Sequence, residues 1–374
     1  MKIGVPTEIK TDEFRVAITP AGVRDLIGNG HQVLVQAGAG KGSSILDQAY
    51  AAQGARIVAT AEDLWTTSDL VFKVKEPQPD EIAWLRAGQI LFAYLHLAPD
   101  AAQTQGLIAS QATCVAFETV TDAQDRLPLL APMSAVAGRL ATQVGAGLME
   151  RLRGGRGVLM GGVPGVAAAQ VVVLGGGVVG ENAAVVAAGM GADVTVFDLS
   201  LDRLAELDAL YGTRLKTRYS TTLAVEEAIS RADLVIGAVL VHGARAPHLI
   251  TREQLALLPE NAALVDVAID QGGCFETSHP TTHSDPTFVV DGVLHYCVAN
   301  MPGAVPTTST QALANATLPY LVRLANGGLQ ALRDNTDLCD GLNVHRGLTT
   351  NQAVADAQGL AYTPAQQALS AAAD

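Results

Sequence analysis

The 374-residue sequence is poor in charged residues, and positive charge is the scarcer sign. Asp and Glu number 37 against 24 Lys and Arg, so the formal net charge is −13. A nucleic-acid backbone would be repelled by most of such a surface. No polybasic cluster is present that would hold the chain on an anionic membrane. We therefore expect neither nucleic acid nor a membrane as a partner.

The sequence also lacks the features of an exported or disulfide-linked protein. The first segment, MKIGVPTEIK, has no long apolar run of the signal-peptide kind. The four cysteines (Cys114, Cys274, Cys297 and Cys339) are widely spaced and form no CxxC pair. We therefore expect reduced thiols in a cytoplasmic protein, with neither disulfides nor a zinc site.

Hydrophobic residues, by contrast, make up 49% of the chain, which is enough for a substantial core. At roughly 150 residues per domain, the length suggests two domains. Residues 157–180 include no charged side chain and could cross a bilayer. The segment contains eight glycines, Pro164 and Gln170, so we interpret it as two glycine loops around a strand.

Short apolar runs alternate with helical patterns along most of the chain, which predicts βαβ units and parallel sheets. Thr19 and Pro20 mark a helix start, because threonine caps free N–H groups and proline is tolerated at the first helical position. We therefore predict an α/β fold with two doubly wound, Rossmann-like domains. The predicted strands cover residues 2–5, 32–36, 70–75, 90–97, 113–117, 171–174, 193–197, 234–238 and 263–268. Long helices are predicted over residues 132–153 and 308–325.

The segment VVVLGGGVVGENAAVVAAGMGADVTVFD is the most specific local signal. Gly175, Gly177 and Gly180 form GxGxxG between an apolar strand and an Ala/Val-rich helix, as in dinucleotide-binding folds. Asp198 ends the next strand, where a carboxylate would bind ribose and repel a 2′-phosphate. The pattern predicts an NAD site. Arg203 could soften the preference for NAD over NADP, or have only a surface or adenine-stacking role.

Charged residues near the carboxyl ends of predicted strands are the catalytic candidates, because ligands of open α/β sheets bind there. Lys75 ends the strand in DLVFKVKEP, and His96 lies near the end of ILFAYLHLAP. Asp270 follows the strand in ALVDVAIDQGG, and Arg15 precedes the first capped helix. Each has a structural alternative: a solvated lysine, a core histidine, a turn-capping aspartate or a locally paired arginine. Together they supply the parts for amino- or hydroxy-acid oxidation, namely cations for a carboxylate and a histidine for proton transfer.

His279 and His283 lie four residues apart in HPTTH, with Asp285 beyond. On a helix this spacing would suit a metal ion, but Pro280 and the threonines favour a loop. We interpret the motif as structural or cofactor-flanking, and we expect no metal site.

Motifs along the whole chain resemble those of bacterial alanine dehydrogenases. They are PTEIKTDEFRVAITPAGV, KVKEPQPDE, LFAYLHLA, LAPMSAVAGRLATQVGA, GGRGVLMGGVPGV, VLVHGARAPHLI, VDVAIDQGGCFETSHPTTH, YCVANMPGAVPTTST and, in the tail, GLNVHRGLTTNQAVADAQGLAYTP. Some are shared with the NAD-binding subunit of the proton-translocating transhydrogenase. HLA at His96, DQGG at Asp270 and the tail favour the dehydrogenase. The glycine loop has GGG where GAG or GSG is usual, and we expect its middle position to vary freely.

The resemblance implies reversible oxidative deamination, in which L-alanine, NAD and water give pyruvate, ammonium and NADH. It implies that Arg15 and Lys75 bind the substrate carboxylate and carbonyl oxygen. It makes His96 the general acid/base, and Asp270 an aid to the water and ammonia steps. The implied cofactor contacts are Ser134, Gly175, Gly177, Val178, Val179, Gly180, Asp198, Arg203, Ser220, Val239, Leu240, Val267, Ala268, Ile269, Asp270, Val298, Ala299, Asn300 and Met301.

The resemblance also implies a discontinuous substrate domain, residues 1–128 plus 306–374, and an inserted NAD-binding domain, residues 129–305. The two long helices would join these domains, and a hinge there would close a cleft between them. Relatives form hexamers, so we expect a cytoplasmic homohexamer.

Three other functions compete with this one. A transhydrogenase subunit would bind NADH without turning over alanine. A non-catalytic NAD-binding or scaffold protein would have no physical need for the full set of strand-end charged residues. A related amino-acid dehydrogenase would act on a longer side chain.

Overall fold

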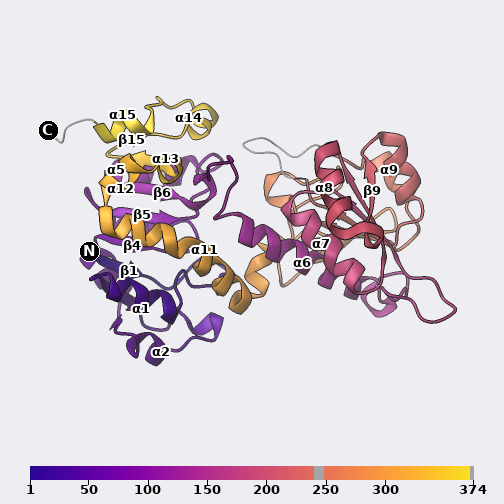
Figure 1. Ribbon diagram of the computed structural model, residues 1–374, viewed down its shortest axis with the longest axis horizontal. Helices are drawn as coiled ribbons and strands as arrows, with labels where there is room; N and C mark the ends of the chain where they lie inside the picture. The colour runs from indigo at the N-terminus through magenta and orange to yellow at the C-terminus, as the bar shows by residue number, and fades with distance from the viewer. Residues whose placement is uncertain (240–247, 371–374) are drawn as a thin grey trace. The chain divides into compact units, whose positions relative to one another are not determined.

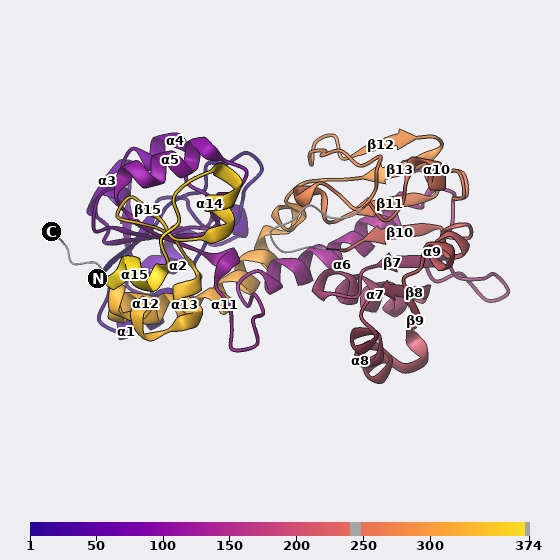
Figure 2. The same ribbon diagram turned by 90° about the horizontal axis from the view of Figure 1, so that it is seen from above.

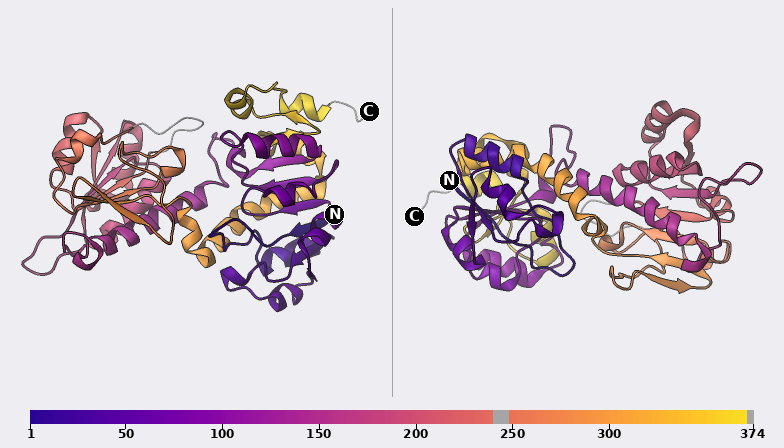
Figure 3. Two further views of the ribbon diagram at one scale, coloured as in Figure 1. Left: turned by 180° about the vertical axis from the view of Figure 1, so that it is seen from behind. Right: turned by 90° about the horizontal axis from the view of Figure 1, so that it is seen from below.

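The computed structural model describes residues 1–239 and 248–370, and the chain divides into two compact units. The first contains Met1–Met133 and Val305–Asp374, and the second contains Ser134–Ala304. Each has its own predominantly parallel sheet with helices packed around it (Figure 1), and Figure 3 shows both from two further sides. The predicted α/β fold class is therefore confirmed.

The eight-stranded sheet of the first unit has the order β15-β14-β6-β5-β4-β1-β2-β3. Its parallel strands are β1 (Lys2–Val5), β2 (Gln32–Gln36), β3 (Arg56–Val58), β4 (Leu70–Phe72), β5 (Ile90–Ala93) and β6 (Thr113–Ala116). At one side, β14 (Leu342–His345) is antiparallel to β6, and β15 (Leu348–Thr349) is antiparallel to β14. The chain winds outward from β1 in one direction and from β4 in the other, so the strand order reverses between them.

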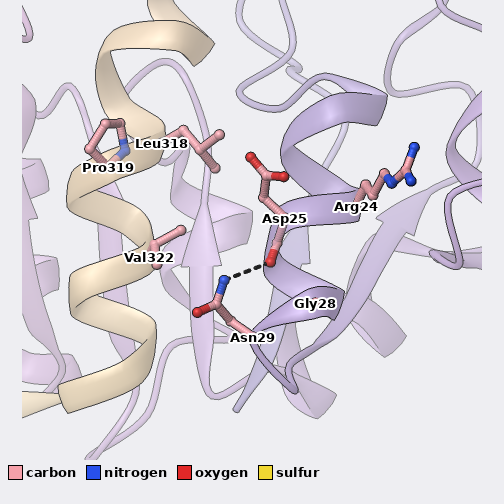
Figure 4. A pocket seen from close by; sticks show the side chains of 7 residues that line it. All are labelled: Arg24, Asp25, Gly28, Asn29, Leu318, Pro319 and Val322. Atoms are coloured by element: carbon pink, nitrogen blue, oxygen red, sulfur yellow. Dashed lines mark hydrogen bonds between the residues drawn. The ribbon is translucent and has the colours of Figure 1, made fainter.

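Two helices of this unit lie side by side. Thr19 caps α1 (Pro20–Gly28) through its side-chain oxygen, as predicted. The long helix α11 (Pro306–Gly327) lies beside α1, and residues of both helices line an open pocket of about 630 Å³, with Leu318 and Val322 facing α1 (Figure 4). The other helices of the unit are α2 (Asp47–Ala51), α3 (Ala61–Thr67), α4 (Pro79–Ile82), α5 (Ala101–Ser110), α12 (Leu329–Asp334), α13 (Thr336–Asp340), α14 (Gln352–Gln358) and α15 (Ala365–Ser370).

A cluster of buried aromatic rings supports the carboxyl edge of this sheet. The rings of Phe92 and Phe117 meet edge to face, with centroids 4.5 Å apart, and Phe72 lies 5.8 Å from each. The Tyr94 ring lies 5.0 Å from Phe117, again edge to face. Interlocked rings of this kind give the loops above them a firm base.

The seven-stranded sheet of the second unit has the order β12-β13-β11-β10-β7-β8-β9, which can be followed in Figure 2. The strands are β7 (Gln170–Leu174), β8 (Asp193–Asp198), β9 (Lys216–Tyr219), β10 (Leu234–Gly237), β11 (Ala263–Asp266), β12 (Thr287–Val290) and β13 (Val293–Tyr296). All pairs are parallel except β12 with β13. The strand order reverses between β7 and β10. The helices are α6 (Ala131–Leu148), whose first three residues belong to the first unit, α7 (Val178–Gly189), α8 (Leu201–Tyr211), α9 (Thr222–Ile229) and α10 (Arg252–Leu255).

Two strands predicted in the first unit are too long at their carboxyl ends. Those over residues 70–75 and 90–97 end with β4 and β5, at Phe72 and Ala93. Beyond β4, the N–H of Val74 donates to a buried carboxylate, not to a neighbouring strand. The charged residues that follow these strands therefore lie in loops.

The helix predicted over residues 132–153 is α6, and it also ends early, at Leu148. Glu150 has extended backbone angles, and a 3₁₀ turn follows at Arg151–Arg153. The short strands β3, β9, β12, β13, β14 and β15 were not predicted. Among the helices of the described residues, none combines the length and apolar character that a bilayer crossing requires.

Candidate active site

In the first unit, one edge of the sheet gathers the predicted substrate residues. The parallel strands β1, β4 and β5 present their carboxyl ends at this edge. The loop after β1 contains Arg15, the loop after β4 contains Lys75, and the loop after β5 contains His96. Because the strand order reverses between β1 and β4, the first two loops flank the position where doubly wound sheets bind ligands.

Arg15 is buried, with 2% of its surface exposed, and a carboxylate that was not predicted holds it. Its Nε donates to Glu13 Oε1 (2.6 Å), its Nη2 donates to Oε2, and its Nη1 lies 3.1 Å from the sulfur of Met133. Burial alone would raise the pKa of Glu13, but hydrogen bonds and charge from Arg15 lower it. A permanently charged, fixed guanidinium is well suited to orient a carboxylate ligand.

Lys73 and Lys75 have different surroundings although they are two residues apart. The Lys73 side chain is 1% exposed, and its Nζ lies 2.7 Å from Glu81 and 3.4 Å from Glu8. Lys75 is 9% exposed, and its charge is among those that lower the pKa of Glu13. Lys73 is thus part of a buried ion-pair network, whereas Lys75 shares a carboxylate neighbour with Arg15.

Glu8 ties the loop after β1 to the loop after β4. Its carboxylate accepts the N–H groups of Val74 (2.6 Å) and Lys75 (3.4 Å). Burial raises the pKa of Glu8 to about 6, although the neighbouring Lys73 charge opposes the shift. The carboxylate therefore takes up a proton at mildly acidic pH.

His96 lies in an exposed loop position with a left-handed backbone conformation (φ 49°). Its ring stacks on that of Tyr94, with centroids 5.7 Å apart and 6° between the planes. The Glu118 carboxylate accepts the His96 backbone N–H (2.6 Å) and lies 3.8 Å from its Nδ1. An accessible imidazole on the same edge as buried cations can exchange protons with a bound anion.

In the second unit, the glycine loop between β7 and α7 approaches neighbouring backbone atoms closely. Gly175 has a φ of 100°, which favours glycine. A Cβ on Gly180 would lie 1.8 Å from the Gly175 oxygen, and a Cβ on Gly138 of α6 would lie 2.1 Å from the Val179 oxygen. Gly177, which precedes α7, has open space around its Cβ position. The loop therefore leaves room for a phosphate beside the amino end of a helix.

The middle glycine of the loop is less free to vary than predicted. A Cβ on Gly176 would lie 3.1 Å from Leu207 and 3.2 Å from the Asp198 carboxylate. That carboxylate accepts the N–H groups of Gly176 (2.7 Å) and Ser200 (2.8 Å). Asp198 thus braces the loop and also places an acid at the end of β8.

Arg203 is directed toward the glycine loop. Its Nε donates to the Gly176 oxygen (2.7 Å), and its guanidinium pairs with Glu181 and Glu206. Two carboxylates therefore balance its charge, which weakens any attraction for a 2′-phosphate.

The other predicted cofactor residues follow further strands of the same edge. They are Ser220 after β9, Val239 after β10, Val267, Ala268, Ile269 and Asp270 after β11, and Val298, Ala299, Asn300 and Met301 after β13. Ser134 lies on α6, one turn before the glycine that contacts the loop. Leu240 lies outside the described residues. The sheet thus brings most of the set to one edge.

Asp270 is exposed in a short 3₁₀ turn, Ile269–Gln271, after β11. The loop around it is anchored by Asp266, which is fully buried and accepts three backbone N–H groups and the Ser278 hydroxyl (2.6 Å). Burial raises the pKa of Asp266, against the effect of these hydrogen bonds. The anchor holds the position of an acid that is itself accessible.

The HPTTH segment is not helical, as predicted. The His279 ring stacks on Phe288 with centroids 3.7 Å apart, and Phe288 stacks on the buried His295 at 4.9 Å. His283 Nε2 lies 3.4 Å from the carbonyl oxygen of Asn300. Within the described part of the chain, no three His, Cys, Asp or Glu side chains form a metal-ligating group.

Two family models together match nearly all of the chain. One, "Alanine dehydrogenase/PNT, N-terminal domain", matches residues 4–137, and the other, "Alanine dehydrogenase/PNT, C-terminal domain", matches residues 141–352. The chain belongs to the alanine dehydrogenase/PNT family. The predicted family resemblance is therefore confirmed.

Individual members of the alanine dehydrogenase/PNT family match the chain over almost its full length. The "Alanine dehydrogenase" of Halomonas elongata is 59% identical over 98% of this chain and 99% of its own. That of Mycolicibacterium smegmatis is 56% identical over 99% of this chain and 100% of its own. A solved "L-alanine dehydrogenase" superimposes with a TM-score of 0.93 at 50% identity, covering 96% of this chain and 99% of that one.

A transhydrogenase structure from Sinorhizobium meliloti is more distant. It has a TM-score of 0.80 at 26% identity and covers 94% of this chain and 100% of its own. Membership of the alanine dehydrogenase/PNT family implies a nicotinamide dinucleotide cofactor. The open backbone at Gly177 and the acid Asp198 fit such a cofactor.

Four important carboxylates were not predicted: Glu8, Glu13, Glu118 and Asp266. Asp266 ends β11, Glu118 lies two residues after β6, and Glu8 and Glu13 lie in the loop after β1. The rule that ligands lie outside these ends would have selected them, as it selected the cations. The sequence gives no local pattern for a carboxylate that accepts hydrogen bonds from distant backbone N–H groups.

Proposed function

We propose that this member of the alanine dehydrogenase/PNT family is an NAD-dependent oxidoreductase that converts L-alanine and water reversibly to pyruvate and ammonium. The observation that carries the proposal is the high identity, over almost the whole chain, to relatives named alanine dehydrogenase. The transhydrogenase structure shares the fold but far less of the sequence.

In this proposal the first unit binds the substrate. Arg15, fixed by Glu13, orients the carboxylate of alanine or pyruvate, and Lys75 polarises the carbonyl oxygen of pyruvate. The proposed substrate domain covers residues 1–128 plus 306–374, and the proposed NAD-binding domain covers residues 129–305.

His96 is the proposed general acid/base. It moves protons as the carbinolamine forms from pyruvate and ammonia and as it collapses, and its ring is held by Tyr94. The exposed carboxylate of Asp270 assists the addition and loss of water and ammonia. NAD, when bound, accepts the hydride that leaves the substrate Cα.

The proposed cofactor is NAD, not NADP. Asp198 accepts the ribose hydroxyls, and its negative charge opposes a 2′-phosphate. Arg203 is already paired with two acids, so it offers little compensation. The predicted contacts along the carboxyl edge of the second sheet belong to the same proposal, and so do Ser134, on α6, and Leu240.

A cytoplasmic homohexamer remains our proposal for assembly and location. Its support is the low content of charged residues, 16% of the chain, since a large assembly covers much surface. Sedimentation analysis of the purified protein tests it: a species of six chain masses is expected, and a monomer would contradict it.

Absorbance at the NADH band tests the proposed reaction. Purified protein, NAD and L-alanine at alkaline pH should produce NADH, with D-alanine, L-serine and L-lactate as controls. Turnover of L-alanine far faster than of the controls is expected. NADH binding without turnover of any amino acid would contradict the dehydrogenase function and favour a transhydrogenase subunit.

A further inference from the structure

The backbone of His96 is in a conformation that needs support. Its φ of 49° lies in the left-handed region, which only a few per cent of non-glycine residues adopt. Such a conformation persists only when its surroundings determine it. The imidazole itself offers little anchorage, since 46% of the side chain is exposed.

The support comes from the carboxylate of Glu118. This residue belongs to the 3₁₀ turn Phe117–Thr119 that follows β6, the neighbour of β5. Its Oε1 accepts the N–H of His96 (2.6 Å), and both of its oxygens accept the N–H of Leu95 (3.1 and 3.3 Å). These two successive N–H groups, directed at one anion, fix the φ and ψ angles of Leu95 and the position of the His96 nitrogen, from which the His96 backbone and side chain continue.

Other contacts hold the same loop from different sides. The Leu95 carbonyl accepts a hydrogen bond from the Gln103 amide (2.9 Å). The Tyr94 hydroxyl donates to the Leu129 carbonyl (2.6 Å), which anchors the ring on which His96 stacks. Among these contacts, only the one to Glu118 engages the backbone of His96 itself.

We propose that Glu118 is a positioning residue: its carboxylate sets the backbone of His96 so that the imidazole meets the substrate in line for proton transfer. The inference rests on the proposed function, in which His96 is the general acid/base. The role depends on the reach of the Glu118 oxygens to two N–H groups, and not on contact with substrate or cofactor.

The reach of the side chain and its charge can be separated by substitution. Glu118→Gln keeps the length and one accepting oxygen but removes the charge. Glu118→Asp keeps the charge but shortens the side chain by one methylene. Glu118→Ala removes both, and Glu62→Ala, at an exposed site on α3 of the same unit, is the matched control.

The measurement is steady-state reductive amination of pyruvate, in H₂O and in D₂O, with NADH binding followed by fluorescence. We expect kcat to fall about 100-fold in Glu118→Ala, as for a misplaced catalytic group. KM for pyruvate and the Kd for NADH should stay within about threefold of wild type, while the solvent isotope effect on kcat rises because proton transfer becomes slower. Glu118→Gln should retain more activity than Glu118→Asp.

Other outcomes would overturn the inference. A merely structural role would lower kcat in proportion to the folded fraction and leave the isotope effect unchanged. Greater activity in Glu118→Asp than in Glu118→Gln would show that charge matters, not reach. If Glu118→Ala does not fold, the comparison of Glu118→Asp with Glu118→Gln still tests the inference. Wild-type protein without alanine turnover would refute the proposed function itself, which is a separate result.

Discussion

The carboxyl edges of the two sheets are built from different chemical groups. Both sheets are doubly wound and reverse their strand order at the centre, between β1 and β4 or between β7 and β10. In the first unit, the edge is built from buried ion pairs such as Arg15 with Glu13 and Lys73 with Glu81. In the second unit, it is built mainly from glycines and backbone N–H groups.

The difference matches the ligands that the two edges are proposed to bind. A small amino acid offers only a carboxylate and a reacting carbon, so a few fixed charges must orient it. A dinucleotide offers phosphates and sugars over a longer span, which backbone N–H groups and a helix end can follow. In this proposal, one topology serves two kinds of recognition.

The largest expected effect is on the carboxyl edge of the first sheet, with Arg15, Lys75 and His96, called here the charged edge. Replacing His96 with alanine should lower alanine turnover by about 10³-fold, because the proposed general acid/base is lost. NADH binding, measured by fluorescence, should stay nearly intact. Loss of NADH binding would show that His96 has a structural role.

Substitutions at the two lysines of the charged edge should affect stability and substrate binding separately. Lys73→Met leaves Glu8 and Glu81 without their shared cation and should lower the free energy of unfolding by about 3–5 kcal/mol. Lys75→Met, the matched variant, should lose less stability but raise KM for pyruvate. Equal losses of stability in thermal denaturation would remove the distinction drawn between them.

The glycines of the second edge allow a similar separation. Gly180→Ala forces a Cβ to within 1.8 Å of a carbonyl oxygen and should destabilise the second unit by several kcal/mol. Gly177→Ala meets no atom within 4 Å, so the fold should survive while NADH binding weakens about tenfold. Calorimetry with and without NADH distinguishes the two. A stable Gly180→Ala protein would contradict the packing.

Glu8 should make the charged edge sensitive to pH. Its pKa is raised from 4.5 to about 6, so between these values the folded state holds more protons than the unfolded state. The free energy of unfolding should therefore fall by about 2 kcal/mol as the pH rises through this window. Glu8→Gln should lack this decrease in parallel denaturant titrations. The same slope in both proteins would place the titration elsewhere.

The smallest expected effect is on Asp198, the acid at the carboxyl edge of the second sheet. Asp198→Ala removes the acceptor of two backbone N–H groups and the charge that opposes a 2′-phosphate. NAD binding should weaken about tenfold, and discrimination against NADP should relax. An unchanged NAD/NADP ratio of kcat/KM would refute the ribose assignment.

The parts of the molecule that local sequence determines were predictable. Thr19 and Pro20 marked the start of α1, and β1 and β2 have the predicted bounds. The glycine loop was recognisable because its turn, close approach and helix packing each require glycine at a fixed spacing.

The pairings of the charged edge were not predictable in the same way. Glu8 and Val74 are 66 residues apart, and Glu118 and His96 are 22 apart. Which carboxylate meets which N–H group depends on strand order, and strand order is a property of the whole sheet. The ends of β4 and β5 were misplaced for a related reason: beyond them, the N–H of Val74 donates to Glu8, and the N–H groups of Leu95 and His96 donate to Glu118.

The close approach of α6, the glycine loop and α7 limits how this protein could be redesigned. Gly138 and Gly180 let three backbone segments touch, so no side chain lies between them to be exchanged. A change of cofactor preference would have to be engineered at the rim, at Asp198, Ser200 and Arg203. There, a substitution changes the local charge, and at Asp198 or Arg203 it also removes a hydrogen bond to Gly176, whereas the layer beneath has no space for an added side chain.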